Sequence, residues 1–278
     1  MLECGGGASA EEKINRKVRI GFLDSPSVSS EEFSNIIDEA NRPDFWNYYN
    51  ISDPQYAPYT TLAIELVPFD SLVDMIMALD AGKIDTIEML DCMGKYFFKQ
   101  GNNADKYITY QYLTGLDSYL SMGFAKGNKW FEPFNSAIKA AKQDGTLQLL
   151  KAKYLIDIEE NEPQPVKFES FPDAETVKIA VTGDCPPIDY VAADGSPAGY
   201  NTELLAYIGR RLKVNIKIVS INTGARAAAL SSGRADGVFW FWSNNSEDGS
   251  YDTPEGVVLT EPYYRYDTCV YIGRKLHE

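Results

Sequence analysis

Ala229-Leu230-Ser231-Ser232-Gly233-Arg234-Ala235-Asp236 decides the fold, because nearly the same phrase stands at Ala78-Leu79-Asp80-Ala81-Gly82-Lys83-Ile84-Asp85. Each copy ends a helical pattern, continues with glycine, a basic residue and aspartate, and leads into an apolar stretch. A glycine just past a helix is typical of a left-handed stop, and the aspartate then opens a buried strand. Two such junctions predict two α/β lobes built to one plan, with a cleft between them.

Composition narrows the classes of function. The chain has 278 residues, enough for two modest domains, and a formal net charge of −14. That charge argues against nucleic acid as a partner, because phosphate binding needs a basic face. The only histidine is His277, and the four cysteines (Cys4, Cys92, Cys185 and Cys269) lack zinc-ligand spacing. We therefore expect no metal site, no cofactor and no histidine-based catalysis.

The start of the chain predicts a tether over residues 1–17. Cys4 precedes small and then charged residues, which resembles the mature start of a bacterial lipoprotein whose cysteine carries lipid. A small residue is expected before such a cysteine, but Glu3 stands there. The alternative is therefore that the first residues do not belong to the natural protein. The sequence contains neither a run of about 18 apolar residues nor a signal peptide, which predicts a chain that is cytosolic or already trimmed.

Hydrophobic periodicity and turn residues place the other elements. An aromatic, proline-interrupted insertion near 38–61 contains Trp46 and several tyrosines, and an acidic, proline-rich linker follows residue 156. We expect strands near 18–24, 62–67, 108–112, 118–125, 177–182, 215–219 and 269–272, and helices near 71–81, 92–100, 131–154 and 202–212.

Five phrases in the second half carry a resemblance: Val177–Val181, Pro186–Tyr190, Asp194–Leu204, Ala229–Asp236 and Thr260–Tyr264. In this order and spacing, residues 177–275 are similar to the first part of the extracellular solute-binding proteins of ABC transporters, the family that includes the polar amino-acid binders. The resemblance implies an α/β, two-lobed type II periplasmic-binding-protein fold, in which each lobe is a mixed sheet flanked by helices. It also implies a monomer outside the cytoplasm, periplasmic or anchored to the membrane, which delivers a small polar solute to a membrane ABC permease.

The order of the segments resembles that family after circular permutation. Residues 18–110 match the usual second lobe, 111–156 supply a hinge crossing and the closing segment of the first lobe, 157–176 are the linker, and 177–278 form the main part of the first lobe. This order predicts that only the segment near 107–120 crosses between the lobes. The alternative is a piece cut from a tandem array.

The resemblance also points to residues of the site on the first lobe. The family holds a ligand carboxylate with an arginine that is missing from Ser243–Gly249, and Arg226 is the candidate substitute. Strand alternation turns either Phe239 and Phe241 or Trp240 and Trp242 to one side, and we expect Trp240 or Trp242 to contact the ligand. Ser243 aligns with a ligand-contacting serine. Core packing, or a surface charge for Arg226, is the structural alternative.

Candidates from the other lobe and the Pro-Pro turn complete the set. Ser25 and Ser27 follow a strand, where exposed N–H groups attract an anion or simply cap a helix. Asp91, with Glu88 as alternate, lies near the family's ammonium-binding aspartate. Asp184, Asp189 and Tyr190 surround the Pro-Pro turn.

The preferred function is a solute-binding protein, not an enzyme, that captures an amino-acid-like solute for an ABC importer. The alternatives are a ligand-sensing extracellular domain of a signalling system and a dehydratase-like enzyme on the same fold. The enzyme would need Glu88, Asp91 or Asp184 as its general acid or base.

Overall fold

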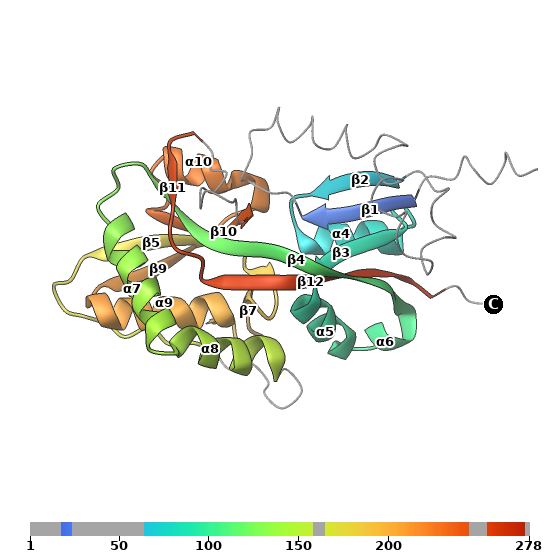
Figure 1. The fold of residues 1–278 in the computed structure, drawn as a ribbon, viewed down its shortest axis with the longest axis horizontal. Coiled ribbons are helices and arrows are strands. Elements are labelled where there is room, and N and C mark those ends of the chain that lie inside the picture. The colour runs from blue at the N-terminus through green and yellow to red at the C-terminus, as the bar shows by residue number, and fades with distance from the viewer. Residues whose placement is uncertain (1–17, 24–63, 158–164, 245–254, 276–278) are drawn as a thin grey trace, which may run out of the picture.

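A continuous mixed sheet runs through the computed structural model, which describes residues 18–23, 64–157, 165–244 and 255–275. Its strand order is β2-β1-β3-β12-β4-β10-β5-β9, and β11 pairs with β4 (Figure 1). The strands are β1 (Val18–Leu23), β2 (Ile64–Phe69), β3 (Thr86–Leu90), β4 (Tyr107–Ala125), β5 (Thr176–Val181), β9 (Asn215–Ser220), β10 (Gly237–Asn244), β11 (Val257–Leu259) and β12 (Tyr264–Arg274). A small second sheet contains β6 (Asp184–Cys185), β7 (Asp189–Val191) and β8 (Pro197–Ala198).

Two parallel trios of strands define two lobes. Lobe 2 contains the trio β2-β1-β3, and lobe 1 contains β9-β5-β10, so each trio has its first strand in the middle. The described helices of lobe 2 are α4 (Leu72–Asp80), α5 (Asp91–Lys99) and α6 (Asn103–Lys106). Those of lobe 1 are α7 (Phe131–Gln143), α8 (Thr146–Lys151), α9 (Tyr200–Leu212) and α10 (Arg226–Ser231), with a π-helix at Ala152–Ile156 and a 3₁₀ turn at Thr223–Ala225. This arrangement confirms the two-lobed α/β architecture.

The repeated phrase forms the same junction in both lobes. α4 and α10 each end just before the glycine, and Gly82 and Gly233 both have φ of 69°. This left-handed conformation favours glycine because a side chain would crowd the backbone. The predicted helix stops are therefore confirmed.

The aspartate of each copy fastens its trio of strands. The Asp85 amide donates to the Arg19 carbonyl, and the Arg19 amide donates to the Asp85 carboxylate, each over 2.9 Å. Asp236 and Lys178 exchange the same two bonds in lobe 1, each over 2.8 Å. The aspartate side chain thus adds one hydrogen bond to the backbone ladder at the point where the parallel strands begin. This bond explains why the repeated phrase has aspartate at that position.

Among the residues that the structure describes, two strands cross between the lobes, not the one that the permuted order predicts. β4 is a single 19-residue strand where two strands were expected, and β12 pairs with it along both lobes. The first residues of β12 pair with the lobe 1 part of β4, whereas Cys269–Gly273 pair with β3 of lobe 2. The end of β12 therefore lies in lobe 2, although the predicted segments place all of 177–278 in lobe 1.

Helices cover both lobes. α4 packs against β1 and β3, α5 packs against β3 and β12, and α7 and α8 pack against α9. None of the described helices is both long and apolar enough to span a membrane.

Candidate functional site

The N-terminus of α4 in lobe 2 binds a carboxylate of lobe 1. The Leu72 amide donates to Asp184 Oδ2 over 3.0 Å. The first amides of a helix have no acceptor within the helix, and the helix dipole favours an anion there. Ser71 already caps the helix by accepting from the Asp74 amide, so Asp184 satisfies a different orphan donor.

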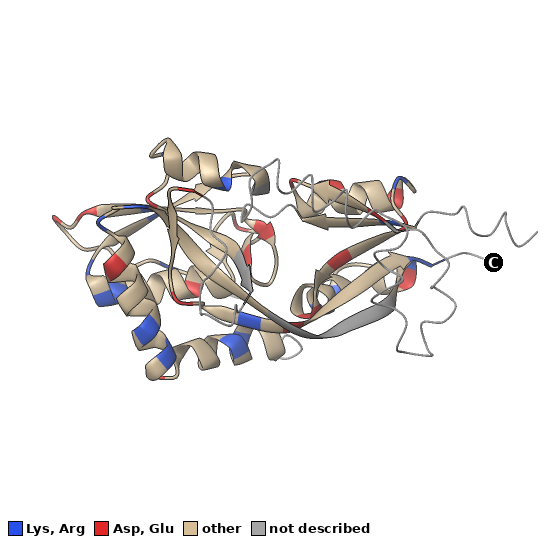
Figure 2. Cartoon of the chain, turned by 45° about the horizontal axis from the view of Figure 1, so that its top comes forward, with Lys and Arg blue, Asp and Glu red and all other residues tan. Residues whose placement is uncertain are grey.

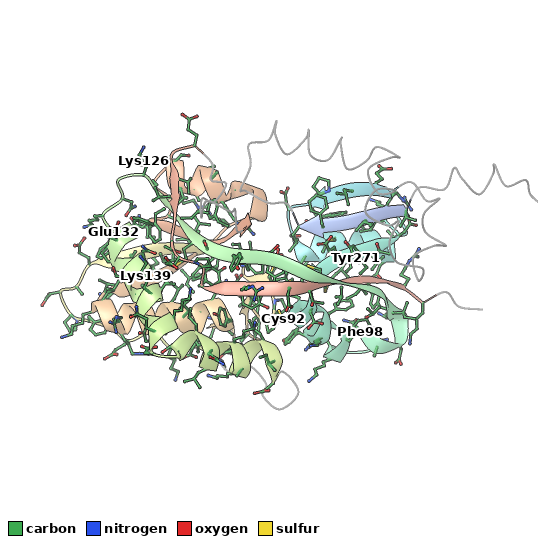
Figure 3. The ribbon with its side chains drawn as sticks, in the orientation of Figure 1. Cys92, Phe98, Lys126, Glu132, Lys139 and Tyr271 are labelled. Carbon is green, nitrogen blue, oxygen red and sulfur yellow. The ribbon has the colours of Figure 1, made fainter. Side chains whose placement is uncertain are left out.

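Aromatic and thiol groups make further contacts between the lobes. The Tyr96 ring on α5 lies 5.9 Å from the Tyr190 ring on β7, and Cys92 Sγ lies 3.8 Å from the Tyr264 hydroxyl of β12. Cys92 and Tyr96 are four residues apart, so they lie on one face of α5. Figure 3 shows Cys92 where α5 meets the crossing strands. This face of α5 therefore meets lobe 1.

Asp189 is the centre of a buried polar network behind the lobe 1 surface. Its carboxylate accepts from the Thr182 hydroxyl (2.9 Å), the Gly183 amide (2.7 Å), the Asn201 amide nitrogen (2.9 Å) and the Trp240 indole N–H. Burial raises the pKa of Asp189 above its ordinary value, and these hydrogen bonds, led by that of Trp240, offset only part of the rise. Four donors from three segments thus converge on one carboxylate.

Residues from three other segments form hydrogen bonds with Trp240. Its φ is 70°, in the left-handed region that is rare for a residue with a Cβ atom. Its amide donates to the Tyr263 hydroxyl over 3.3 Å, and its carbonyl accepts from Arg226 Nη1 over 3.1 Å. The Arg226 guanidinium also lies 6.0 Å from the indole centroid. Trp240 is 8% exposed and packs in the main core cluster, as the core-packing alternative expects, while ligand contact by Trp240 or Trp242 stays a prediction.

A β-bulge at this point overturns the expected alternation of side chains. The register of β10 with β4 shifts between Val238 and Phe241. Phe239 and Trp240 both pack in the main core cluster, whereas Val238 and Phe241 pack in a second cluster against α10. The prediction that Phe239 and Phe241 share one side is therefore wrong, because the bulge inserts an extra residue.

Arg226 is buried, contrary to the surface alternative. Its side chain begins α10, is 3% exposed and donates to the strand that follows the second copy of the repeat. Alanines flank Arg226 in the sequence, and its guanidinium reaches the backbone of β10.

The two alternative acids of lobe 2 lie in different surroundings. Glu88 is on β3 and accepts from the Tyr271 hydroxyl over 3.2 Å, and burial raises its pKa. Asp91 is the first residue of α5 and forms a 2.6 Å ion pair with Lys95. Asp91 is adjacent in sequence to Cys92, which contacts lobe 1, so it is nearer the lobe boundary.

The charged residues are spread over both lobes. Figure 2 shows several Lys and Arg along the helices of lobe 1, whereas Asp and Glu are scattered over both lobes, some of them where the lobes face each other. In the described ranges, no group of three His, Cys, Asp or Glu side chains could hold a metal ion.

Several sequence candidates lie outside this geometry. Cys4, Ser25 and Ser27 lie outside the described residues, as do the tether 1–17 and the insertion near 38–61. Trp242 and Ser243 are described only as backbone, paired with Leu120 and Tyr119.

Sequence reasoning missed Leu72, Cys92, Tyr96 and Tyr264. The four-residue spacing on α5 and the Pro-Tyr-Tyr phrase were the available signals for the last three.

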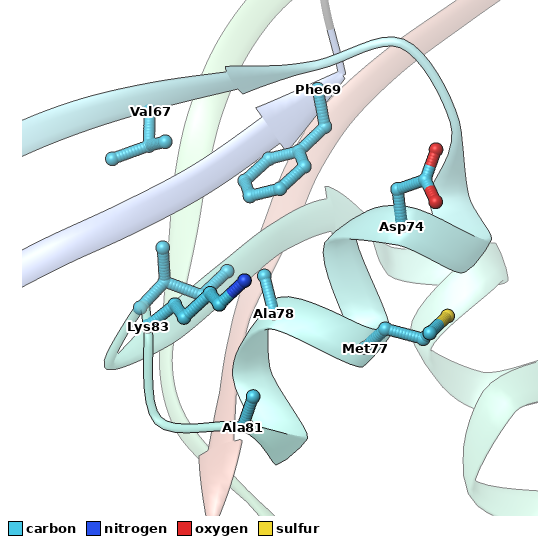
Figure 4. A pocket seen from close by; sticks show the side chains of 8 residues that line it. Val67, Phe69, Asp74, Met77, Ala78, Ala81 and Lys83 are labelled. Carbon is cyan, nitrogen blue, oxygen red and sulfur yellow. The ribbon is translucent and has the colours of Figure 1, made fainter.

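A hollow of about 460 Å³ opens between β2 and α4 within lobe 2. Figure 4 shows Val67 and Phe69 on β2 facing Ala78 on α4, with Asp74 and Lys83 as the charged groups of the lining. None of the side chains that join the lobes lines this hollow.

Comparison with solved structures finds only distant likeness. The zinc-bound ligand-binding component of an ABC-type import system from Staphylococcus aureus has 14% identity and a TM-score of 0.43, covering 94% of this chain and 66% of that one. An ArgBP mutant from T. maritima has 13% identity and a TM-score of 0.41, with coverages of 94% and 83%. The alkanesulfonate-binding protein SsuA from Xanthomonas axonopodis pv. citri, bound to MOPS, has 12% identity and a TM-score of 0.39, with coverages of 92% and 65%. The chain thus spans slightly less than two thirds of the first and third proteins.

Comparison by sequence identifies a similar family for one part of the chain. No curated protein matches the chain. The sequence model of the bacterial extracellular solute-binding proteins, family 3, matches residues 177–272, about a third of the chain. This range lies within the 177–275 segment whose phrases carry the resemblance, and it contains Asp184, Asp189, Arg226 and Trp240. Residues 177–272 are therefore similar in sequence to the bacterial extracellular solute-binding proteins of family 3.

Proposed function

We propose that the protein is an extracytoplasmic solute-binding protein that captures a small polar, amino-acid-like solute between its lobes for an ABC importer. The observation that carries this proposal is the set of side chains meeting across the lobe boundary, Asp184 on the α4 N-terminus above all. Solute binding by two lobes needs a hinge and facing polar groups whose contacts differ between open and closed states. β4 and β12 supply the continuous connections, and α4, α5 and the β6–β7 hairpin supply the facing groups.

The partner and the anchor belong to the same proposal. A membrane permease would receive the solute, and Cys4 would carry the lipid that keeps the monomeric protein at the membrane surface. The three acids considered for a dehydratase have separate partners: Glu88 binds Tyr271, Asp91 pairs with Lys95, and Asp184 binds α4. This separation favours binding over acid–base chemistry.

Thermal-shift measurements test this function. A solute that binds only the folded state raises the melting temperature, by an amount that grows with concentration over Kd. The panel comprises L-amino acids, dipeptides, polyamines and organic acids at 1 mM. We expect one class to raise the melting temperature of the wild-type protein and to do so less for Asp184→Ala. Asp194→Ala is the matched control, because Asp194 is exposed and binds Ser196 in its own turn. If no solute stabilises the protein but a signalling partner does, the transport proposal fails.

We also propose that the order of segments is a true circular permutation. Arg19 donates to the Gly82 carbonyl over 3.0 Å, and Arg274 donates to the Asp80 carbonyl over 3.4 Å. The start of β1 and the end of β12 therefore lie at one turn, so a short loop could join them at little entropic cost. A variant that joins residue 275 to residue 18 and opens within 158–164 should fold and bind the same solute class. A variant that aggregates would favour the tandem-array alternative.

A further inference from the structure

We propose that Asp189 and Arg226 are positioning residues of the solute site. They hold Trp240 in its left-handed conformation and so set the course of β10 into Trp242 and Ser243. The inference rests on the proposed function, because Ser243 aligns with a solute-contacting serine of the family. It gives Arg226 a different task from the one that the sequence suggests, which is to hold a solute carboxylate.

The first step is the conformation of Trp240. A φ of 70° costs free energy for any residue with a Cβ atom, and such residues persist only where surrounding groups determine them. Every polar group of Trp240 has a partner on another element. The indole N–H binds Asp189, the carbonyl binds Arg226, and the amide binds Tyr263. These partners come from β7, α10 and the segment before β12.

The second step is the burial of two opposite charges. Asp189 is 0% exposed and Arg226 is 3% exposed. Burying a charged group is costly unless hydrogen bonds or an opposite charge compensate it, and an apolar core would not need either group. Trp240 binds the carboxylate through its indole and the guanidinium through its carbonyl, so the two charges hold one residue from two directions.

The third step connects the network to the lobe boundary. Asp189 also accepts from the Gly183 amide, and the next residue, Asp184, binds the N-terminus of α4 across the boundary. One buried carboxylate thus fixes the turn that carries Asp184 and the bulge that leads to Ser243. Since the bulge shifts the register by an added residue, losing it would change the partners on β4 of the β10 residues that follow it.

Fluorine NMR of the protein labelled with 5-fluorotryptophan tests this coupling without any solute. The chain has four tryptophans, and the Trp242→Phe variant assigns the Trp242 resonance. In Asp189→Asn an NH2 group, which cannot accept, replaces one of two oxygens that each accept from two donors, so the side chain can no longer hold both the indole of Trp240 and the amide of Gly183. In Arg226→Met the carbonyl of Trp240 loses its donor. We expect both changes to shift or broaden the Trp242 resonance. Thr182→Val is the matched control, because it removes another bond to Asp189 and leaves the bonds of Trp240 intact.

Two further variants guard against misfolding and against a merely structural role. Arg226→Lys keeps a cation and a donor, so it should restore the wild-type Trp242 resonance. Trp240→Phe removes the indole bond to Asp189 together with one ring of the side chain, and it should reproduce the Asp189→Asn effect if that variant does not fold. A Trp242 resonance unchanged in Asp189→Asn, Arg226→Met and Trp240→Phe would overturn the proposal, and so would an equal change in Thr182→Val.

Solute binding is the second readout. The probe is an equimolar mixture of the twenty common L-amino acids, at 1 mM each. We expect the mixture to raise the melting temperature of Asp189→Asn and Arg226→Met by less than half the wild-type amount, and that of Thr182→Val by the full amount. Equal increases in all four proteins would overturn the proposal. If the mixture does not stabilise the wild-type protein, the amino-acid part of the proposed function fails, whereas the NMR result still decides the positioning roles.

Discussion

The contact between Asp184 and α4 gives the sharpest prediction about lobe closure. Leu72 is the first residue of α4, so its amide has no acceptor within the helix, and Asp184 accepts from it over 3.0 Å. Asp184→Asn keeps an acceptor of similar shape but removes the negative charge from the positive end of the helix dipole. For a partly buried carboxylate at such a position we expect a loss of about 1 kcal/mol.

That loss has a measurable local consequence. About 1 kcal/mol corresponds to a factor of about 5 in the equilibrium between the closed contact and its opened form. The exchange rate of the Leu72 amide hydrogen, followed by NMR or on a peptide spanning residues 68–76, should rise about 5-fold in Asp184→Asn. Because salt screens exposed charges, 1 M NaCl should shrink the difference between the two proteins.

Asp194→Asn is the control for this experiment. It changes the net charge equally, but Asp194 is exposed and accepts from the Ser196 amide within its own turn. Its Leu72 exchange rate should equal that of the wild-type protein. The reasoning is refuted if Asp184→Asn leaves Leu72 exchange unchanged, or if Asp194→Asn accelerates it to the same extent.

Three further predictions concern the fold. In Gly233→Ala the added Cβ atom lies in open space, but the residue must keep a φ of 69°, so the free energy of unfolding in urea should fall by about 1 kcal/mol. Gly82→Ala has the same φ and should lower it further, because an Arg274 nitrogen lies 3.1 Å from the added Cβ atom. Burial raises the pKa of Glu88 above its ordinary value of 4.5, so the folded protein binds this proton more tightly than the unfolded chain does. The stability that the bound proton contributes is lost as pH rises through the pKa of the folded state. Glu88→Gln should therefore gain stability relative to the wild-type protein between pH 4 and pH 8 in urea titrations, and a constant difference would contradict this. Gly123→Ala would bring a Cβ atom within 2.3 Å of the Phe241 ring, so it should cost about 1–3 kcal/mol, and added Phe241→Leu should recover part of that loss in a double-mutant cycle.

The repeated phrase predicted the parts of the fold that local chemistry determines. Glycine at a left-handed helix stop and aspartate at the start of a parallel trio are signals carried by a few adjacent residues, and both copies form the predicted junction. The course of β12 escaped prediction, because its 11 residues pair with β3 and β4, which lie far earlier in the chain.

The site was less predictable for the same reason. Regular alternation assumes an unbroken ladder, but the bulge at Trp240 is determined by Asp189, Arg226 and Tyr263 on other elements. The hydrogen bond from Leu72 to Asp184 joins residues 112 positions apart, and no pattern in the sequence near Leu72 predicts it. Residue type identified candidates, whereas only the fold shows which side chain each of them binds.

Closure of the two lobes on a small solute is the central claim, and a distance measured between the lobes tests it most directly. Lys99 on α5 and Lys213 after α9 are exposed, so Lys99→Cys and Lys213→Cys in a Cys4→Ser background provide sites for a fluorescent donor and acceptor. We predict that the solute class that raises the melting temperature also shortens the donor–acceptor distance, and that Asp184→Asn weakens this response. A solute that binds and stabilises the protein without changing the distance would contradict the account.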